Sequence, residues 1–245
     1  MSEIVWEIGD CMTFLPELED GIINLAIIDS PYYKIVPAKW DKAWRTRNQY
    51  LNWLEKVMLE VRRVMKNNGS IYVFGDDKTI AYVQTRLDKQ FEFLNHLIWL
   101  KRNNKSIIYP QSYYRYACIS ERILFYGMKK PNLGKEIKRT YNYIKGVYEI
   151  IDVPMVGGLE LHGHPTQKPV ALLEKLILIS SNEGDLILDP FLGSGSTLEA
   201  CRRTNRSCIG FEKDEQWEEL YHKRAREDIP RLTSYWEEFD VNNTE

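Results

Sequence analysis

The fold of this chain is decided by one stretch, Leu188-Asp189-Pro190-Phe191-Leu192-Gly193-Ser194-Gly195-Ser196-Thr197. The apolar run at residues 185–188 is long enough for one buried strand. Residues 196–203 predict a helix, which Ser194 or Ser196 can cap. A strand therefore leads through a Gly-x-Gly turn into a helix. Glycines allow positive φ angles and close approach of a ligand, and the first N–H groups of a helix attract an anionic group.

A second predicted strand at residues 207–212 completes this pattern, because it ends in Glu212. A carboxylate at the end of the next parallel strand is well placed to accept hydrogen bonds from ribose hydroxyls. The two strands and the helix therefore predict a βαβ nucleoside-binding site. The alternative is an ordinary strand-to-helix turn, since Leu198 stands where the dinucleotide fingerprint has its third glycine.

A second motif, Asp29-Ser30-Pro31-Tyr32-Tyr33, follows the apolar strand predicted at residues 22–28. Open α/β sheets bind their ligands at the carboxyl ends of strands, where this motif emerges. The rest of the chain alternates between strands and helices, which predicts a mostly parallel sheet covered on both faces. The other predicted strands are 4–8, 70–74, 91–100 and 119–126, and the other predicted helices are 12–18, 49–66, 76–89, 170–180 and 214–228.

Length and composition favour one α/β domain in a reduced, cytoplasmic protein. The chain has 245 residues, a net charge of −2 and no Cys-x-x-Cys pair, so a structural zinc site is not expected. The N-terminus does not resemble a signal peptide, and no apolar run approaches the length of a membrane span. We therefore expect neither a metal nor a membrane as a partner.

The positive charge is concentrated between Lys101 and Gly146, where eleven basic residues accompany two acidic ones. Seven tyrosines interleave with these charges. Basic residues with aromatic faces suit contact with a nucleic acid backbone and stacking on its bases. The alternative is a solvated surface with a few core tyrosines.

Four segments together resemble the β-type DNA amino-methyltransferases, in which the catalytic motif precedes the cofactor motif. They are Asp29-Ser30-Pro31-Tyr32, His164-Pro165-Thr166-Gln167-Lys168-Pro169, residues 189–195 and Ile209-Gly210-Phe211-Glu212. The resemblance spans about residues 3 to 227. It implies a Rossmann-like methyltransferase fold in a single domain, 1–245, with a mostly parallel doubly wound sheet and a short target-recognition insertion at 128–161. It also implies a bacterial or phage-encoded enzyme with S-adenosylmethionine as cofactor and DNA as substrate, in DNA methylation and restriction-modification.

The resemblance also assigns residues to roles. The expected catalytic residues are Asp29, Ser30, Pro31 and Tyr32. The expected cofactor-binding residues are Asp10, Cys11, Asp29, Thr166, Lys168, Asp189, Phe191, Gly193, Ser194, Gly195, Ser196, Thr197, Glu212 and Lys213. The expected nucleic-acid-binding residues are Tyr33, Lys39, Trp40, Lys101, Arg102, Lys105, Arg115, Lys129, Lys130, Lys138 and Arg139.

Three of these assignments have structural alternatives. Asp10 can cap the short helix that follows it as well as contact the adenine of the cofactor. The loop that carries Trp40 can be a lid or an ordinary surface loop. His162-Gly163-His164 suggests a metal site only weakly, because no third ligand is evident.

The register of the catalytic motif favours N6 of adenine, because Asp29 directly follows the predicted strand and the Pro31-Tyr32 pair is then intact. The target base must leave the duplex, and Tyr32 can stack on it. The Asp29 carboxylate and the Ser30 carbonyl can accept hydrogen bonds from the exocyclic amine, which positions it for direct methyl transfer. Ser30 replaces the usual first proline of the family motif, so the turn loses a fixed φ. No cysteine follows a proline, which argues against methylation at cytosine carbon 5.

Other functions remain open from the sequence. The register Ser30-Pro31-Tyr32-Tyr33 would resemble the motif often associated with cytosine N4. RNA adenine methylation and a weakly catalytic DNA-binding subunit are further alternatives. A homodimer or a partner subunit is also compatible with the short recognition segment. A nicotinamide oxidoreductase is not favoured, because nothing in the Asp29 motif serves hydride transfer.

Overall fold

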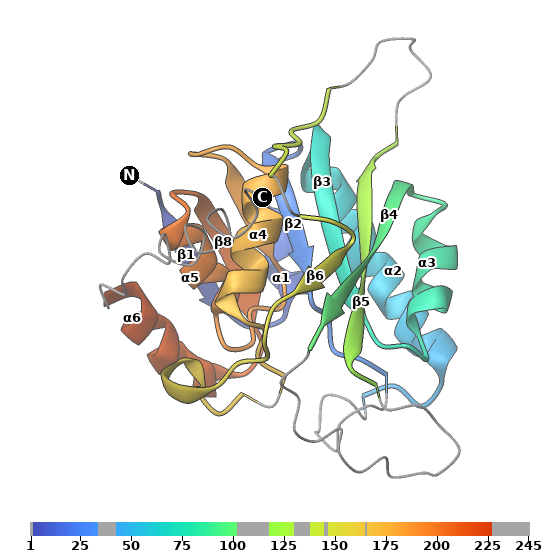
Figure 1. Ribbon diagram of the computed structural model, residues 1–245. Helices are drawn as coiled ribbons and strands as arrows, with labels where there is room; N and C mark the ends of the chain where they lie inside the picture. Colours follow the sequence, from blue (N-terminus) through green and yellow to red (C-terminus); the bar gives the residue numbers. More distant parts are fainter. Residues whose placement is uncertain are drawn as a thin grey trace, which may run out of the picture.

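The protein is built on an eight-stranded sheet, seen in the computed structural model with strand order β1-β8-β7-β2-β3-β5-β4-β6 (Figure 1). The structure describes residues 2–33, 43–101, 118–129, 138–144, 147–164 and 166–226. The strands in these ranges are β1 (Ile4–Ile8), β2 (Ile23–Ile28), β3 (Met65–Gly75), β4 (Phe91–Leu100), β5 (Ser120–Met128), β6 (Ile150–Asp152), β7 (Leu186–Asp189) and β8 (Ser207–Glu212).

The sheet is mostly parallel, as the sequence predicts. β1, β8, β7, β2 and β3 pair in parallel, and β6 pairs in parallel with β4. β5 is antiparallel to both of its neighbours, β3 and β4. The sequence did not predict β6, which lies within the segment 128–161 and adds a strand to the edge of the sheet. Three residues are too few to produce a strand pattern in sequence.

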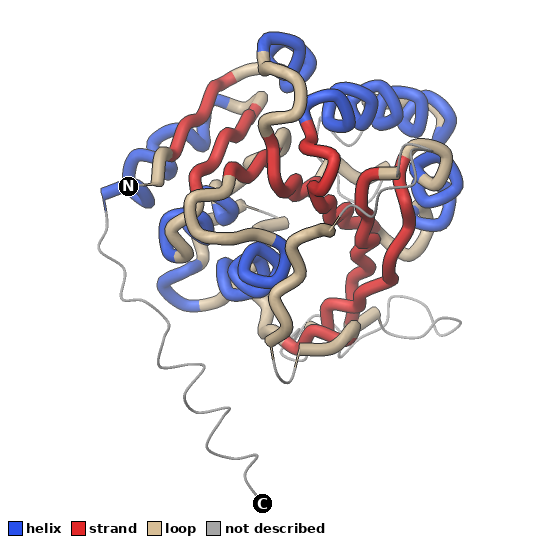
Figure 2. Tube along the Cα trace, turned by 90° about the horizontal axis from the view of Figure 1, so that it is seen from above, coloured by secondary structure: helices blue, strands red, loops and turns tan. Residues whose placement is uncertain are grey.

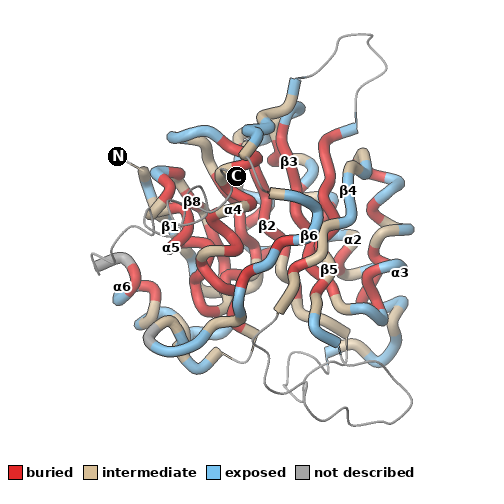
Figure 3. The backbone as a smooth tube through the Cα atoms, viewed as in Figure 1, coloured by how far each residue is buried: buried red, intermediate tan, exposed pale blue. Residues whose placement is uncertain are grey.

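Helices cover both faces of the sheet (Figure 2). They are α1 (Cys11–Phe14), α2 (Arg47–Val64), α3 (Ile80–Leu87), α4 (Val170–Ser180), α5 (Ser196–Arg203) and α6 (Glu218–Arg226), with 3-10 turns η1 (Leu15–Glu17), η4 (Gly158–Glu160) and η5 (Glu215–Trp217). One apolar core lies under α2 and α3, and the other lies under α4 and α5. The central strands β2, β3, β5 and β7 are largely buried between these two layers (Figure 3).

α2 shows where local sequence signals succeed and where they fail. Thr46 forms a capping box with Gln49 at the start of the helix, and such reciprocal bonds fix a helix boundary. The predicted end at Asn67-Asn68-Gly69 is wrong, because the helix stops at Val64 and these residues lie within β3. A register shift in the pairing of β2 with β3 accommodates the extra residues.

The connectivity brings the functional motifs to one edge of the sheet. Parallel strands end at the same edge, so the residues at the carboxyl ends of β1, β2, β7 and β8 come together there: Asp10, Asp29, Asp189 and Glu212. β5 runs in the opposite direction and therefore begins at this edge, with Ser120 and Glu121. We refer to this edge of the sheet, where the predicted catalytic motif lies, as the catalytic edge.

The described residues contain no helix suited to spanning a membrane and no cluster suited to a metal ion. No helix within the described ranges combines the length and the apolar character that crossing a bilayer requires. Among the described side chains, no three His, Cys, Asp or Glu residues converge as they would around a metal ion.

Candidate active site at the carboxyl edge of the sheet

Asp189 anchors the glycine loop from inside the protein. Its carboxylate accepts hydrogen bonds from the Phe191 amide at 2.9 Å and from the Thr197 hydroxyl at 2.5 Å. Burial raises the pKa of Asp189 to about 7. These bonds tie the end of β7 to the first turn of α5. Asp189 therefore shapes the loop, and its direct contact with a cofactor stays a prediction.

The two glycines of the loop have left-handed backbones. Gly193 has φ of 52° and Gly195 has φ of 74°, a region that side chains with a Cβ disfavour. A Cβ on Gly195 would lie 2.7 Å from the Tyr221 ring, and the Tyr221 hydroxyl donates to the Gly193 carbonyl at 2.6 Å. The loop is thus held tightly against α6.

The N-cap of α5 differs from the sequence prediction. Gly195 occupies the N-cap position and no side chain caps the helix. The buried hydroxyls of Ser194 and Ser196 lie 3.1 Å apart and bond to each other. The prediction that Ser194 or Ser196 caps the helix is therefore wrong, because the N-cap position has a left-handed backbone, which favours glycine. The first amides of α5 therefore receive no side-chain cap.

Glu212 and Asp10 stand at the carboxyl ends of two neighbouring strands, β8 and β1. The Glu212 carboxylate accepts from the Gly193 amide at 2.7 Å and from the Asp214 amide at 2.8 Å, and burial raises its pKa. Asp10 caps α1 by accepting from the Met12 amide at 3.0 Å, so the capping role is confirmed. Lys213 donates to the other oxygen of Asp10 at 2.8 Å.

The Cys11 thiol is buried next to Asp10. Burial raises its pKa to about 12, so the thiol stays neutral and unreactive at ordinary pH. Contact of Asp10 or Cys11 with a cofactor adenine stays a prediction.

Asp29 is the centre of a buried polar network that joins distant parts of the chain. The Lys168 ammonium lies 2.8 Å from one oxygen of Asp29 and 2.9 Å from the other. The Tyr32 hydroxyl lies 3.0 Å from Asp29. Burial raises the pKa of Asp29, although the Lys168 charge opposes the shift. Lys168, which the resemblance assigns to cofactor binding, places its ammonium on the Asp29 carboxylate, and its contact with a cofactor stays a prediction.

Glu121, which none of the sequence motifs indicates, also belongs to this network. Its carboxylate lies 3.0 Å from the Lys168 ammonium, 2.5 Å from the Lys101 ammonium and 2.5 Å from the Tyr32 hydroxyl. Burial would raise its pKa, but Lys168 and Lys101 hold the pKa of Glu121 down at about 2. An acidic residue within a strongly basic segment was the one available signal.

Ser30 and the neighbouring aromatic residues form a wall beside Asp29. The buried Ser30 hydroxyl lies 3.3 Å from the Tyr50 hydroxyl. Rings from the catalytic motif, the segment before α2, α2 itself and the glycine loop pack together in this wall: Tyr33, Trp44, Tyr50, Trp53 and Phe191. Pro31 is partly exposed at its edge. Tyr32 turns its hydroxyl toward the carboxylates, so its stacking on a base stays a prediction.

The His164-Thr166-Lys168 segment is held rigidly before α4. Glu160 accepts from the first amide of α4, that of Val170, at 2.7 Å. The His164 ring packs on Trp217, and its Nδ1 accepts from the Thr166 amide at 3.3 Å. Burial lowers the pKa of His164 to about 4, so the ring is neutral.

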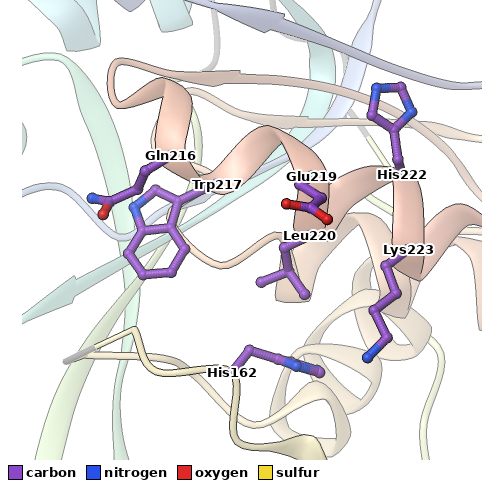
Figure 4. Close-up of a pocket in the computed structure, with 7 residues that line it drawn as sticks. All are labelled: His162, Gln216, Trp217, Glu219, Leu220, His222 and Lys223. Atoms are coloured by element: carbon purple, nitrogen blue, oxygen red, sulfur yellow. The ribbon is translucent and has the colours of Figure 1, made fainter.

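Trp217 also lines a cavity of about 610 Å³. His162 faces η5 and α6 across it (Figure 4). Its lining is His162, Gln216, Trp217, Glu219, Leu220, His222 and Lys223, and it includes no residue predicted for catalysis or cofactor binding.

The predicted basic face is corrected by the topology. Lys101 is at the catalytic edge, but Lys129 follows the other end of β5. Nine residues of strand separate the two edges, roughly 26 Å at the usual rise per residue. Arg139 lies near that far end, because it pairs with Glu92 and reaches the Met128 carbonyl. Exposed Lys138 precedes it.

These far-edge side chains lie away from Asp29, and their contact with a nucleic acid stays a prediction. The remaining predicted nucleic-acid residues lie outside the described parts of the chain: Lys39, Trp40, Arg102, Lys105, Arg115 and Lys130. Pro165 of the His-Pro-Thr-Gln-Lys-Pro segment is also outside them.

Comparisons with known proteins match this arrangement. A family model described as DNA methylase, for the N6 and N4 enzymes, matches residues 23–223. The type II methyltransferase M2.MboI of Moraxella bovis is 30% identical, over 91% of this chain and 88% of its own length. The chain belongs to the DNA methylase family. The DNA adenine methyltransferase YhdJ of Escherichia coli (strain K12) is 28% identical, over 85% of this chain and 78% of its own.

Solved structures place this DNA methylase in the same fold class. The M1.HpyAVI–SAM complex has a TM-score of 0.71 at 25% identity, and the match covers 91% of this chain and 100% of that one. The cytosine-N4-specific PvuII DNA methyltransferase has a TM-score of 0.75 at 16% identity, covering 95% and 90% of the two chains, and this likeness concerns the fold alone. The predicted Rossmann-like methyltransferase fold is confirmed.

Proposed function

We propose that this DNA methylase transfers a methyl group from S-adenosylmethionine to the exocyclic N6 of adenine in DNA. The observation that carries the proposal is the buried Asp29 carboxylate at the end of β2, between the glycine loop and the aromatic wall. The relatives support the substrate class, since YhdJ is named a DNA adenine methyltransferase and M2.MboI a type II methyltransferase.

The residues at the catalytic edge fit S-adenosylmethionine. The glycine loop has left-handed backbones at Gly193 and Gly195, and a turn without Cβ atoms suits close approach of a ligand. Glu212 stands at the end of β8, where a carboxylate accepts from ribose hydroxyls. Asp10, Thr166 and Lys213 would complete the binding set. When bound, the cofactor supplies an electrophilic methyl group.

The chain itself would position the target amine. Asp29 accepts a hydrogen bond from the amine and stabilises the positive charge that develops on nitrogen, which is an electrostatic contribution to catalysis. The Ser30 carbonyl supplies a second acceptor, and Tyr32 and the aromatic wall offer faces for an extruded base. The Asp29 side chain is only 20% exposed, and low exposure to water strengthens such electrostatic interactions.

Adenine is favoured over cytosine because the side-chain contacts of Asp29 and Ser30 suit a motif that starts at Asp29. The Asp29 side chain is an acceptor within the polar network, whereas the Ser30 hydroxyl turns toward Tyr50. A register that started at Ser30 would leave the Asp29 carboxylate without a catalytic role. Cytosine N4 is the alternative acceptor, since the family model covers both N6 and N4 enzymes.

The segment 153–161 is our proposal for the contact between the recognition insertion and DNA, since β6 leads it to the catalytic edge. The proposal differs from the predicted insertion 128–161 by leaving out the part near Lys129. A homodimer or a partner subunit stays a prediction of the sequence.

The test is methyl transfer from labelled S-adenosylmethionine to unmethylated genomic DNA, followed by mass analysis of the nucleosides. N6-methyladenine is the expected product. N4-methylcytosine would keep the fold and the mechanism but correct the base. Transfer to RNA alone, or binding of cofactor and DNA without transfer, would contradict the proposal and favour an RNA enzyme or a non-catalytic subunit.

A further inference from the structure

Two carboxylates and two ammonium groups alternate in one buried row beside the catalytic motif. The row is Asp29, Lys168, Glu121 and Lys101, and its neighbouring groups lie 2.5–3.0 Å apart. The exposed fraction of the side chain is 7% for Lys168, 9% for Glu121, 18% for Lys101 and 20% for Asp29. Only Asp29 has a role in the proposed reaction, so the other three groups call for an explanation.

Lys168 is shared between two acids. An ammonium that pairs with a single buried carboxylate weakens that carboxylate as an acceptor, because the positive charge compensates the negative charge within the pair. The distances to Asp29 and Glu121 are nearly equal, at 2.8 Å and 3.0 Å. Glu121 therefore takes up part of the Lys168 charge and leaves Asp29 with part of its own.

Tyr32 is also shared, and here Glu121 is the closer partner. The phenol has a single proton to donate. Its oxygen lies 2.5 Å from Glu121 and 3.0 Å from Asp29. Donation to Glu121 leaves a lone pair of the Asp29 oxygen available for another donor. Without Glu121, both Tyr32 and Lys168 would turn to Asp29 and occupy its acceptor positions.

We propose that Glu121 is a positioning residue, which shares Lys168 with Asp29 and holds the Tyr32 hydroxyl so that Asp29 stays able to accept the target amine. This inference rests on the proposed function, because it takes Asp29 as the acceptor. Lys101 completes the arrangement by compensating Glu121 from the other side, and its ammonium also lies 4.5 Å from the centre of the Trp99 ring.

Glu121→Gln tests the role with little change of shape. We expect kcat for methyl transfer to genomic DNA to fall roughly tenfold to a hundredfold, the range for losing a hydrogen bond to a charged group. Cofactor affinity, measured by equilibrium binding of S-adenosylmethionine, stays unchanged. The ionisable groups that face Asp29 are Lys168, Glu121, Tyr32 and Asp189. Removing the Glu121 charge removes a cause that raises the pKa of Asp29, so the acid limb of the kcat profile moves to lower pH.

Lys168→Met provides a second variant, which is expected to shift the pKa of Asp29 in the opposite direction. Asp29 then loses the charge that lowers its pKa, so the acid limb moves to higher pH. A merely structural role would not move the two profiles in opposite directions. Glu55→Gln is the matched control, because Glu55 pairs with Arg86 between α2 and α3 and lies outside the network. Its profile is expected to match that of the unmodified protein.

Each outcome decides between the two levels of inference. Opposite shifts in the two variants support the positioning role. A Glu121→Gln protein that keeps kcat and the acid limb overturns it while the proposed function stands. If that variant does not fold, Glu121→Asp takes its place, because it keeps the charge but withdraws the carboxylate from Tyr32 and Lys168; an unchanged kcat in Glu121→Asp overturns the positioning role equally. Absence of methyl transfer by the unmodified protein would instead refute the proposed function.

Discussion

Lys168 places its ammonium 2.8 Å from the Asp29 carboxylate, although 139 positions of sequence separate the two residues. Asp29 follows β2, and Lys168 directly precedes Pro169 at the N-cap of α4. The pair is therefore assembled by the order of strands in the sheet and not by local sequence. It ties the end of β2 to the segment before α4, which gives the proposed acceptor carboxylate a fixed position.

Asp29→Asn is expected to abolish methyl transfer. The amide keeps the shape but loses the negative charge that stabilises the developing charge on the amine, so kcat should fall by roughly a hundredfold or more. Cofactor affinity should change little, because the glycine loop and Glu212 are untouched. Transfer of labelled methyl groups and equilibrium cofactor binding measure the two effects. Asp20→Asn, at an exposed ion pair with Arg63, is the control, and full activity of Asp29→Asn would exclude Asp29 as the acceptor.

Ser30→Ala separates the serine hydroxyl from its backbone carbonyl. The hydroxyl bonds to Tyr50, so its loss should lower the free energy of unfolding by about 1 kcal/mol. The carbonyl remains, and kcat should stay within about threefold, less than 1 kcal/mol of barrier. Urea unfolding and the methyl transfer assay test both statements. A large loss of kcat with unchanged stability would show that the hydroxyl itself takes part in the reaction.

Gly195→Ala should destabilise the loop and impair cofactor binding. A left-handed backbone costs a residue with a Cβ roughly 1–2 kcal/mol, and the new Cβ would lie 2.7 Å from Tyr221. Gly184→Ala carries the same backbone strain, at φ of 81°, with no heavy atom within 4 Å of the Cβ. Gly157→Ala carries neither cost, since its backbone is extended and its Cβ is also clear. Unfolding free energies should therefore fall in the order Gly157→Ala, Gly184→Ala, Gly195→Ala, and equal losses in the last two would rule out the steric contribution.

His164 should make the fold sensitive to mild acid. Its pKa falls from 6.5 in the unfolded chain to about 4 in the folded protein. The unfolded state thus binds a proton at higher pH than the folded state, and stability is lost as the pH drops from 6.5 toward 4. His164→Gln removes this contribution. The difference in unfolding free energy between the two proteins should change over that interval and stay constant above pH 7.5, and a constant difference throughout would mean that the ring titrates normally.

Local sequence determined much of this protein. The helices at 170–180 and 196–203 and the strands at 4–8, 91–100 and 207–212 have the predicted bounds, because their apolar patterns and turn residues are contained within each segment. The same is true of the glycine loop, whose φ values follow from its residue types. The resemblance to the methyltransferases likewise depended on short contiguous motifs.

Only the tertiary structure decided which distant charges meet. The antiparallel direction of β5 brings Glu121 to Asp29 and Lys168 and carries Lys129 to the opposite edge. Strand direction depends on pairing across the sheet, and no pattern within β5 encodes it. For the same reason the sequence grouped the basic residues into one face and overlooked Glu121, whereas the fold places Glu121 in the site and divides the charges between two edges.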